Sequence, residues 1–115
     1  MKSAFVDADA KAAIQNYARK GVNEDLALRQ TVLDTARAMS RSGLSPGRSG
    51  NVSARIGEGM LITPSGMAYD EIAAADIVRV GMDGSVADGQ RKPSSEWHFH
   101  LAAYRTRSDR HAVVH

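Results

Sequence analysis

The spacing of hydrophobic positions predicts helices in the first third of the chain. Between residues 23 and 43, apolar side chains recur every three or four positions, at Leu28, Val32, Ala36 and Met39, which is typical of a helix with one buried face. Residues 8–20 are rich in helix formers and stop at Gly21, a suitable C-cap. Asn23 can cap the segment that follows. We therefore predict two helices, one on each side of Gly21.

Short apolar runs bounded by turn residues predict strands in the middle of the chain. Residues 50–66, GNVSARIGEGMLITPSG, indicate two strands around a turn at Gly57–Gly59. The run IVRV at residues 77–80 precedes Asp83 and Gly84, a dipeptide favoured in hairpin turns. We expect strands on both sides of each turn.

The last quarter of the chain predicts a helix followed by a strand. Apolar residues recur at helical spacing, at Trp97, Leu101 and Tyr104, after two serines that can cap a helix start. This pattern predicts a helix from about residue 95 to residue 107. The β-branched run at residues 112–114 then predicts a buried strand that ends at His115.

Length and composition indicate one domain with a modest core. The chain has 115 residues, of which 43% are hydrophobic and 24% charged. We assign residues 1–22 to an N-terminal helical extension and residues 23–115 to the domain. The absence of cysteine excludes disulfides and thiolate metal sites. No apolar run approaches the ~20 residues of a membrane helix, and no signal-peptide pattern is present, so we expect a cytoplasmic protein without membrane contact.

The charge pattern favours a small anionic ligand over a nucleic acid. The net charge is +2, but the basic residues are scattered and only 5% of the residues are aromatic. A nucleic-acid site normally combines a basic stripe with aromatic residues, so we expect no such partner.

Three segments combine glycine or proline with small polar residues: RSGN at 48–51, TPSG at 63–66 and PSSE at 93–96. Such segments let backbone N–H groups approach an anion, and the third also begins a predicted helix, whose dipole favours negative charge. Singly, each is an ordinary turn or cap. Together they predict a phosphate site, provided that all three converge.

Glu96 and His115 are the candidate reactive residues. A carboxylate at a helix start is usually a favourable first-turn charge, but beside an anion site it can act as a general base or a metal ligand. His115, at the end of a strand, can bind the same metal. Helical geometry places His98 and His100 about 200° apart, so we expect surface or packing roles for them and a solvated His111.

Four segments, GNVSAR, MLITPSGM, KPSSEWHFHLAAYR and HAVVH, occur in an order and at separations that closely resemble the N-terminal half of the class II aldolase/adducin family, especially its L-fuculose-phosphate aldolase type. The resemblance runs from about Leu26 to His115. It implies an α/β fold, a three-layer α/β/α sandwich with a largely antiparallel central sheet that is truncated here, and assembly as a homotetramer.

The resemblance also implies roles for individual residues. The residues that it implies bind the substrate phosphate are Gly50, Asn51, Ser65, Gly66, Ser94 and Ser95. Glu96 is the implied catalytic acid/base and also an implied metal ligand, and His115 is an implied Zn²⁺ ligand. The remaining histidine ligands of the family lie beyond residue 115. Arg48 stands where a small hydroxyl residue is usual in the family, and it either adds a charge to the phosphate site or faces solvent.

The implied activity is that of a zinc-dependent aldehyde-lyase of carbohydrate catabolism. It would cleave a phosphorylated ketose similar to L-fuculose 1-phosphate into glycerone phosphate and an aldehyde. The alternatives are a sugar-phosphate epimerase or dehydratase of the same family, or a non-catalytic, adducin-like assembly fragment. Glu96 and His115 favour the enzyme, since a purely structural head needs neither. Because the metal site is incomplete, we expect the 115-residue chain alone to be inactive.

Overall fold

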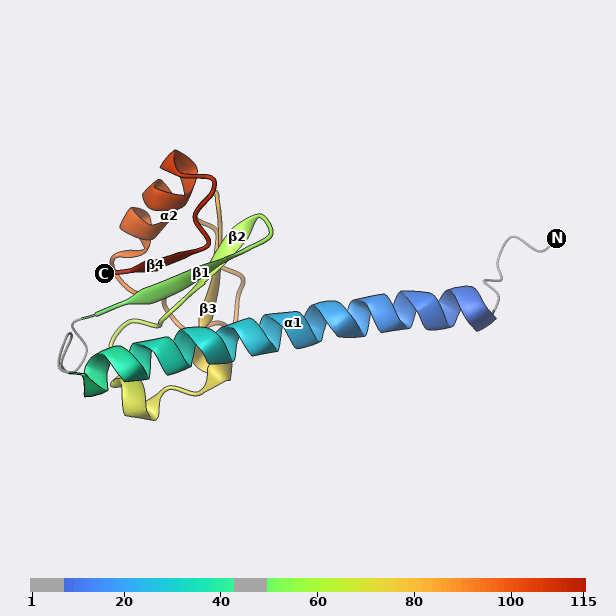
Figure 1. Ribbon diagram of the computed structural model, residues 1–115, viewed down its shortest axis with the longest axis horizontal. Coiled ribbons are helices and arrows are strands. Elements are labelled where there is room, and N and C mark those ends of the chain that lie inside the picture. The colour runs from blue at the N-terminus through green and yellow to red at the C-terminus, as the bar shows by residue number, and fades with distance from the viewer. Residues whose placement is uncertain (1–7, 43–49) are drawn as a thin grey trace.

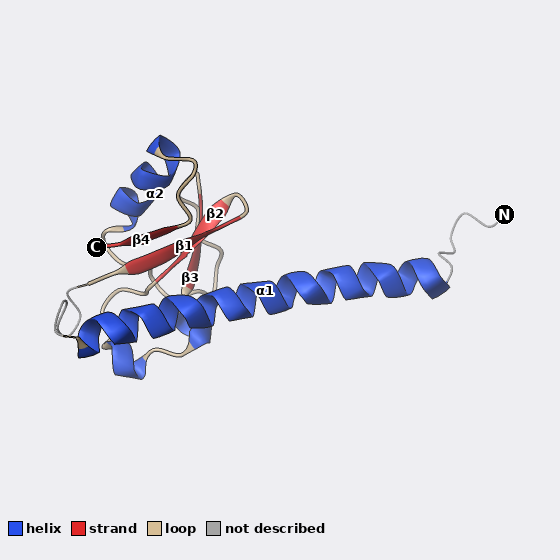
Figure 2. Ribbon diagram, in the orientation of Figure 1, coloured by secondary structure: helices blue, strands red, loops and turns tan. Residues whose placement is uncertain are grey.

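A four-stranded antiparallel sheet lies between two helices of very different length in the computed structural model (Figure 1). The structure describes residues 8–42 and 50–115, with side chains from residue 24 onward. The elements in these ranges are α1 (Ala8–Arg41), β1 (Val52–Ile56), β2 (Gly59–Ile62), η1 (Tyr69–Glu71), η2 (Ala74–Asp76), β3 (Val78–Gly81), α2 (Trp97–Thr106) and β4 (Ala112–Val114). The two helices cover opposite faces of the sheet, which confirms the predicted α/β/α layers (Figure 2).

Helix α1 continues through Gly21, where we predicted the end of one helix and the start of another. That prediction was wrong. A glycine inside a helix costs only about 1 kcal/mol relative to alanine, and helix formers flank Gly21 on both sides. The single helix spans 34 residues and contains the boundary predicted after residue 22. Its N-terminal part extends beyond the sheet (Figure 1).

The predicted apolar face of α1 packs on the sheet. Val32 and Ala36 are buried there, together with Leu33, and Leu28 and Met39 pack at the margin. Burial of this face, rather than intrinsic helix propensity, holds the C-terminal half of α1 in place. Of the helices in the described residues, none combines the length and the hydrophobicity needed to cross a bilayer.

The sheet has the strand order β3-β2-β1-β4, with antiparallel pairing throughout. Strands β1 and β2 form the hairpin predicted around Gly57–Gly59, with Ser53 opposite Ile62. Strand β4 pairs with the other side of β1 and places Val113 opposite Ser53. The C-terminal strand therefore lies beside the first strand of the sheet.

The turn after β3 forms as predicted, but the strand expected after it does not. Only an isolated bridge joins Val80 to Val86, because the following residues, ADG, are poor strand formers. Gly84 has a φ of +86°, and a Cβ built there would lie 3.1 Å from the Trp97 ring. Trp97 thus packs directly on this turn, which only glycine can accommodate.

Alternate residues of the strands face the two helices. The α1 face buries a cluster that consists of Val32, Leu33, Ala36, Val52, Ala54, Leu61, Tyr69, Ile72 and Ile77. The α2 face buries a second cluster, Met60, Ile62, Val78, Val80, Leu101 and Tyr104. Ser53 lies on the α2 face because it alternates with Val52 and Ala54.

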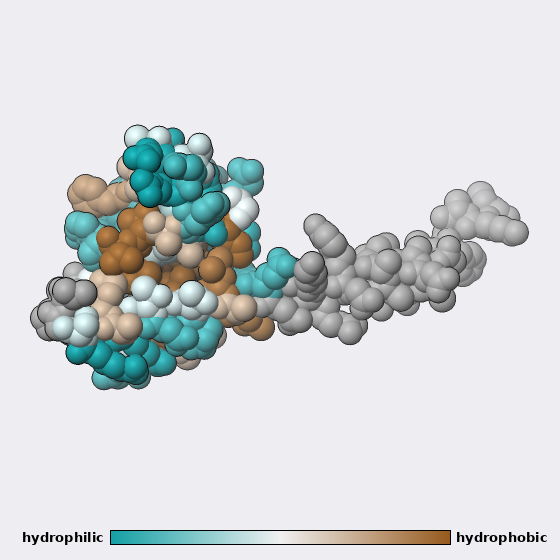
Figure 3. Space-filling model, viewed as in Figure 1, coloured by the Kyte–Doolittle hydropathy of each residue, from teal (hydrophilic) through white to brown (hydrophobic). Residues whose placement is uncertain are grey.

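Strand β4 is an edge strand, and our prediction of a buried strand was wrong. Val114 is 55% exposed, and Val113 is only partly buried against the α2 cluster. A β-branched run fits an edge strand as well as a central one, so its composition did not distinguish the two positions. Figure 3 shows hydrophobic surface on this side of the molecule, between the two helical layers.

Candidate functional site

The described parts of the three glycine- and serine-containing segments meet at one end of the sheet. Asn51 directly precedes β1 and Thr63 directly follows β2, so the hairpin brings them together. The Thr63 N–H donates to the Val52 carbonyl (3.1 Å), and the Ser94 N–H donates to the Thr63 carbonyl (3.0 Å). The third segment is thereby attached to the second.

A second backbone contact aligns the two proline-containing segments. The Ser65 N–H donates to the Lys92 carbonyl (2.8 Å), and Pro64 and Pro93 form an antiparallel bridge. Ser65, Gly66 and Ser95 remain exposed, whereas Gly50, Asn51 and Ser94 are buried. Gly66 has a φ of +75°, a conformation that favours glycine. All six residues predicted to bind phosphate therefore lie on adjoining segments.

Glu96 is held at the start of α2. Its N–H donates to the Ser94 hydroxyl (3.3 Å), and the Trp97 N–H donates to the Ser94 carbonyl (3.0 Å). The helix proper begins at Trp97, two residues later than predicted, and its N-cap residue is Glu96 without a side-chain cap hydrogen bond, so the predicted serine cap does not form. The Glu96 side chain is 33% exposed, so its carboxylate can meet a ligand at the rim of the site.

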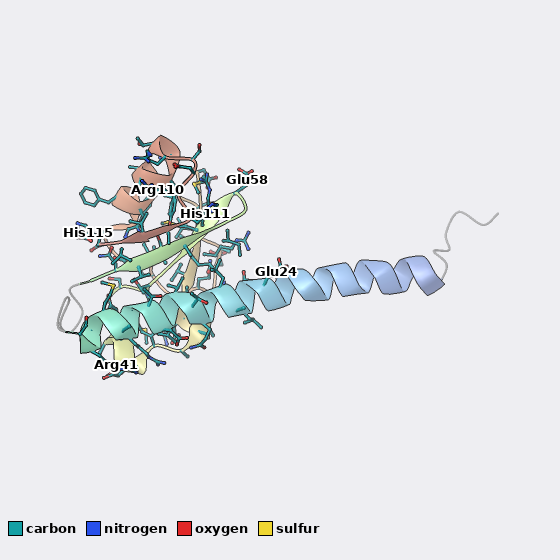
Figure 4. All side chains as sticks on the ribbon, in the orientation of Figure 1. Glu24, Arg41, Glu58, Arg110, His111 and His115 are labelled. Atoms are coloured by element: carbon teal, nitrogen blue, oxygen red, sulfur yellow. The ribbon has the colours of Figure 1, made fainter. Side chains whose placement is uncertain are left out.

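His115 is brought to Glu96 by the pairing of β1 with β4. Asn51 and His115 exchange two backbone hydrogen bonds of 2.9 Å. This pair places the Nδ1 atom of His115 in contact with Oε2 of Glu96. Figure 4 shows His115 at one end of β4 and His111 at the other. The two candidate reactive residues, 19 positions apart in the sequence, therefore lie side by side.

Glu96 is a carboxylate at neutral pH. The Asn51 Nδ2 group donates to the same Oε2 atom, and this hydrogen bond, followed by that of His115, lowers the pKa of Glu96 below its usual value. No hydrogen bond within the described ranges engages Oε1 of Glu96. Oxygen Oε2 is thus held by two protein groups, while the side chain as a whole remains partly exposed.

His100, for which the sequence predicted a surface or packing role, is buried here, and its hydrogen-bond partners were not predicted. It is fully buried, with Nδ1 2.6 Å from the Ser53 hydroxyl and Nε2 in contact with Oδ1 of Asn51. The Ser53 hydroxyl also lies 2.8 Å from the Tyr104 hydroxyl. A signal was present, because His100 lies three positions after Trp97 and four before Tyr104, on the buried stripe of α2.

The other histidines take the peripheral positions expected of them. His98 is exposed and stacks on the Trp97 ring, with 3.5 Å between the ring centroids. His111 is exposed at the far end of β4. Among the side chains described, those of residues 24–42 and 50–115, no group of three or more histidine, aspartate or glutamate residues is arranged to hold a metal ion. Arg48 lies outside the described residues.

Comparison with known proteins identifies the family of the chain. Residues 30–115 match the family model for the Class II Aldolase and Adducin N-terminal domain. The chain belongs to this family, so the resemblance read from its four segments is confirmed.

Two curated relatives to which the chain is similar are aldolases. The chain is 47% identical over 88 residues to the L-fuculose phosphate aldolase of Escherichia coli, a match that covers 76% of this chain and 40% of that protein. It is 48% identical over 92 residues to a 5-methylthioribulose-1-phosphate/5-deoxyribulose-1-phosphate aldolase, also of Escherichia coli, covering 80% of this chain and 43% of that one. Both relatives are lyases.

A solved structure confirms the fold. An L-fuculose 1-phosphate aldolase superposes with a TM-score of 0.73 and 37% identity, covering 77% of this chain and 43% of the other. The chain thus spans about 40% of the length of the curated relatives that it matches.

Proposed function

We propose that this chain is part of a zinc-dependent aldehyde-lyase of carbohydrate catabolism. The substrate would be a ketose 1-phosphate similar to L-fuculose 1-phosphate, cleaved to glycerone phosphate and an aldehyde. The observation that supports this most is the contact between Glu96 and His115 beside three converging anion-binding segments. Relatives that act on fuculose, methylthioribulose and deoxyribulose phosphates support a ketose phosphate as the substrate class.

The phosphate would be bound by the six residues on the adjoining segments, namely Gly50, Asn51, Ser65, Gly66, Ser94 and Ser95. Exposed Ser65 and Ser95 offer hydroxyl groups, and glycine at position 66 lets the backbone approach an anion closely. The phosphate group is remote from the bond that breaks. Its binding contributes binding energy and fixes the orientation of the carbonyl group.

Glu96 would carry the proton in the reaction. In the cleavage direction a hydroxyl proton leaves, the carbon–carbon bond breaks, and the electron pair is finally protonated on carbon. A partly exposed carboxylate with one oxygen held by hydrogen bonds is suited to exchange that proton. The fixed oxygen keeps the orientation of the group constant throughout.

The residues present fit a zinc ion in part. Imidazole nitrogen and carboxylate oxygen are both zinc ligands, and in His115 and Glu96 they lie in contact at a partly exposed position. When bound, zinc would supply a Lewis acid that stabilises negative charge on the substrate oxygens. Protein zinc sites use three or four side chains, so the remaining histidine ligands would lie beyond residue 115.

The same proposal includes a homotetramer as the complete enzyme, as the family resemblance implies. An epimerase or dehydratase would use the same groups and differ in the fate of the carbanion. A non-catalytic, adducin-like role is less well supported, because such a role gives no reason for a carboxylate and an imidazole in contact at the rim of the site.

The substrate class is tested with the longest natural form of the protein that carries residues 1–115. Its affinities for L-fuculose 1-phosphate and for unphosphorylated L-fuculose are measured by calorimetry in the presence of zinc. We expect binding of the phosphorylated sugar and weak or no binding of the free sugar. Equal affinity for the two would overturn the proposed phosphate site.

A further inference from the structure

A continuous series of hydrogen bonds leads from the α2 core to Glu96. It passes from the Tyr104 hydroxyl to Ser53 Oγ, from Ser53 to His100 Nδ1, from His100 Nε2 to Asn51 Oδ1, and from Asn51 Nδ2 to Glu96 Oε2. Four of these residues, Tyr104, Ser53, His100 and Asn51, are at least 95% buried. The series connects strand β1 and helix α2 beneath the site.

The charge of Glu96 fixes the direction of every bond in this series. An ionised carboxylate can only accept, so Asn51 must turn its amide NH₂ toward Glu96 and its carbonyl oxygen toward His100. His100 Nε2 must then carry a hydrogen in order to donate to Asn51. A neutral imidazole has one donor and one acceptor, so Nδ1 accepts from the Ser53 hydroxyl.

The burial of His100 keeps the ring neutral, as this pattern requires. The side chain has no solvent exposure, and burial lowers the pKa of His100 to about 4. Two titratable side chains at the rim of the site, Glu96 and His115, also influence the ring. A neutral ring with Nε2 protonated is therefore the form present at neutral pH.

We propose that His100 is a positioning residue for the proton transfer at Glu96, acting through Asn51. This inference rests on the proposed function. The Nε2–H donor prevents the Asn51 amide from rotating, so that its NH₂ group always faces Glu96. When Glu96 gains and loses its proton, the carboxyl group then returns to the same place.

Removal of this donor has a specific consequence. With a leucine at position 100, the Oδ1 atom of Asn51 loses its buried donor, and the amide is free to rotate. Glu96 then has no fixed partner on the α2 side. If His100 only filled space in the core, a leucine of similar volume could replace it without any effect on the reaction.

The bond pattern is tested directly by ¹⁵N NMR of histidine-labelled protein, in its longest natural form. We expect His100 to be neutral at pH 7 and protonated on Nε2. A charged ring, or a hydrogen on Nδ1, would overturn the proposal. This measurement needs no activity and no metal.

The catalytic consequence is tested by the exchange of carbon-bound hydrogen of glycerone phosphate in heavy water, at saturating ligand. His100→Leu should slow the exchange by roughly 10- to 100-fold, the range found when an outer hydrogen-bond partner of a site is removed. His100→Gln, which keeps a donor and an acceptor, should recover most of the rate. His98→Leu, which removes an exposed histidine from the same helix, should leave the rate unchanged.

The outcomes separate this inference from the proposed function. Unchanged exchange in His100→Leu, or equal loss in the Leu and Gln variants, would overturn the positioning role. Because both substitutions disturb the core, thermal unfolding of each variant shows whether a loss of rate follows a loss of fold. If the unsubstituted protein catalyses no exchange, the proposed function fails, and the positioning role fails with it. The NMR measurement of the His100 tautomer still tests the hydrogen bond between His100 and Asn51.

Discussion

The two faces of the sheet are built on different principles. The face covered by α1 buries hydrocarbon side chains such as Leu33 and Leu61, and its polar contacts lie at the margin, where Arg37 Nη2 donates to the Ile72 carbonyl (2.8 Å). The face covered by α2 buries a hydrophobic cluster as well, but Ser53 and His100 lie beside it and bond to each other. We expect one face to contribute stability alone, and we propose that the other also orients Glu96.

This difference predicts which property of the protein a substitution on each face should change. Apolar packing tolerates exchange among side chains of similar volume, whereas a buried polar series needs every donor matched to an acceptor. The α1 face should therefore affect only the free energy of unfolding. The α2 face should affect both that free energy and the reaction.

The largest expected effect separates reaction from stability. Glu96→Gln keeps the size and the hydrogen bonding of the side chain but cannot accept a proton, so turnover of L-fuculose 1-phosphate should fall by ~10²- to 10⁴-fold. The phosphate affinity and the thermal midpoint should stay close to those of the unsubstituted protein. Near-normal turnover would show that Glu96 is only a charge at the start of α2.

The opposite result is expected on the α1 face. Leu61 is fully buried there, and Leu61→Ala should lower the free energy of unfolding by about 2–5 kcal/mol. Chemical denaturation measures this loss. Turnover per folded molecule should be unaffected at temperatures where the variant is folded, and a specific loss of turnover would contradict the division between the faces.

The α2 face should make stability depend on pH. Burial lowers the pKa of His100 from its ordinary value of 6.5 to about 4 in the folded protein, so the unfolded state binds more protons between these pH values. The contribution of neutral His100 to the free energy of unfolding should be fully present above pH 6.5. It should fall by about 3 kcal/mol as the pH drops to 4.

His100→Gln supplies the control for this pH dependence. The variant lacks the buried imidazole but keeps Glu96, so it should lose the part of the pH dependence that arises between pH 6.5 and 4. Denaturation curves at several pH values provide the comparison. An identical pH dependence in both proteins would exclude His100 as its source.

The smallest expected effect concerns α1 itself. Gly21 lies in the helix interior, so Gly21→Ala should raise the stability of the helix by up to about 1 kcal/mol. Amide hydrogen exchange around residue 21 measures the change. If Gly21 instead ended a helix in a left-handed conformation, alanine would destabilise the segment.

Local patterns predicted the parts of the fold that depend on neighbours in the sequence. The β1–β2 hairpin followed from the glycines at 57 and 59, and the buried face of α1 from its apolar spacing. The convergence of the three glycine- and serine-containing segments was only a condition of the predicted phosphate site, and backbone hydrogen bonds bring their described parts together.

The remaining features depend on contacts distant in the sequence. The helical angle between His98 and His100 could be calculated, but not that Ser53 and Asn51, some 47 and 49 positions away, would lie opposite His100. The edge position of β4 likewise depends on strand order, which a β-branched run does not specify. Gly21 misled us because glycine occurs both at helix ends and, at small cost, within helices.

Trp97 has a practical consequence that follows from its contact with the turn at Gly84. It is the only tryptophan of the 115 residues, it adjoins Glu96 in the sequence, and its ring packs on the β3 turn. Its fluorescence therefore arises from one known place beside the candidate site. A ligand that seats against the first turn of α2 can be titrated by the change in emission, without a label and without catalytic turnover.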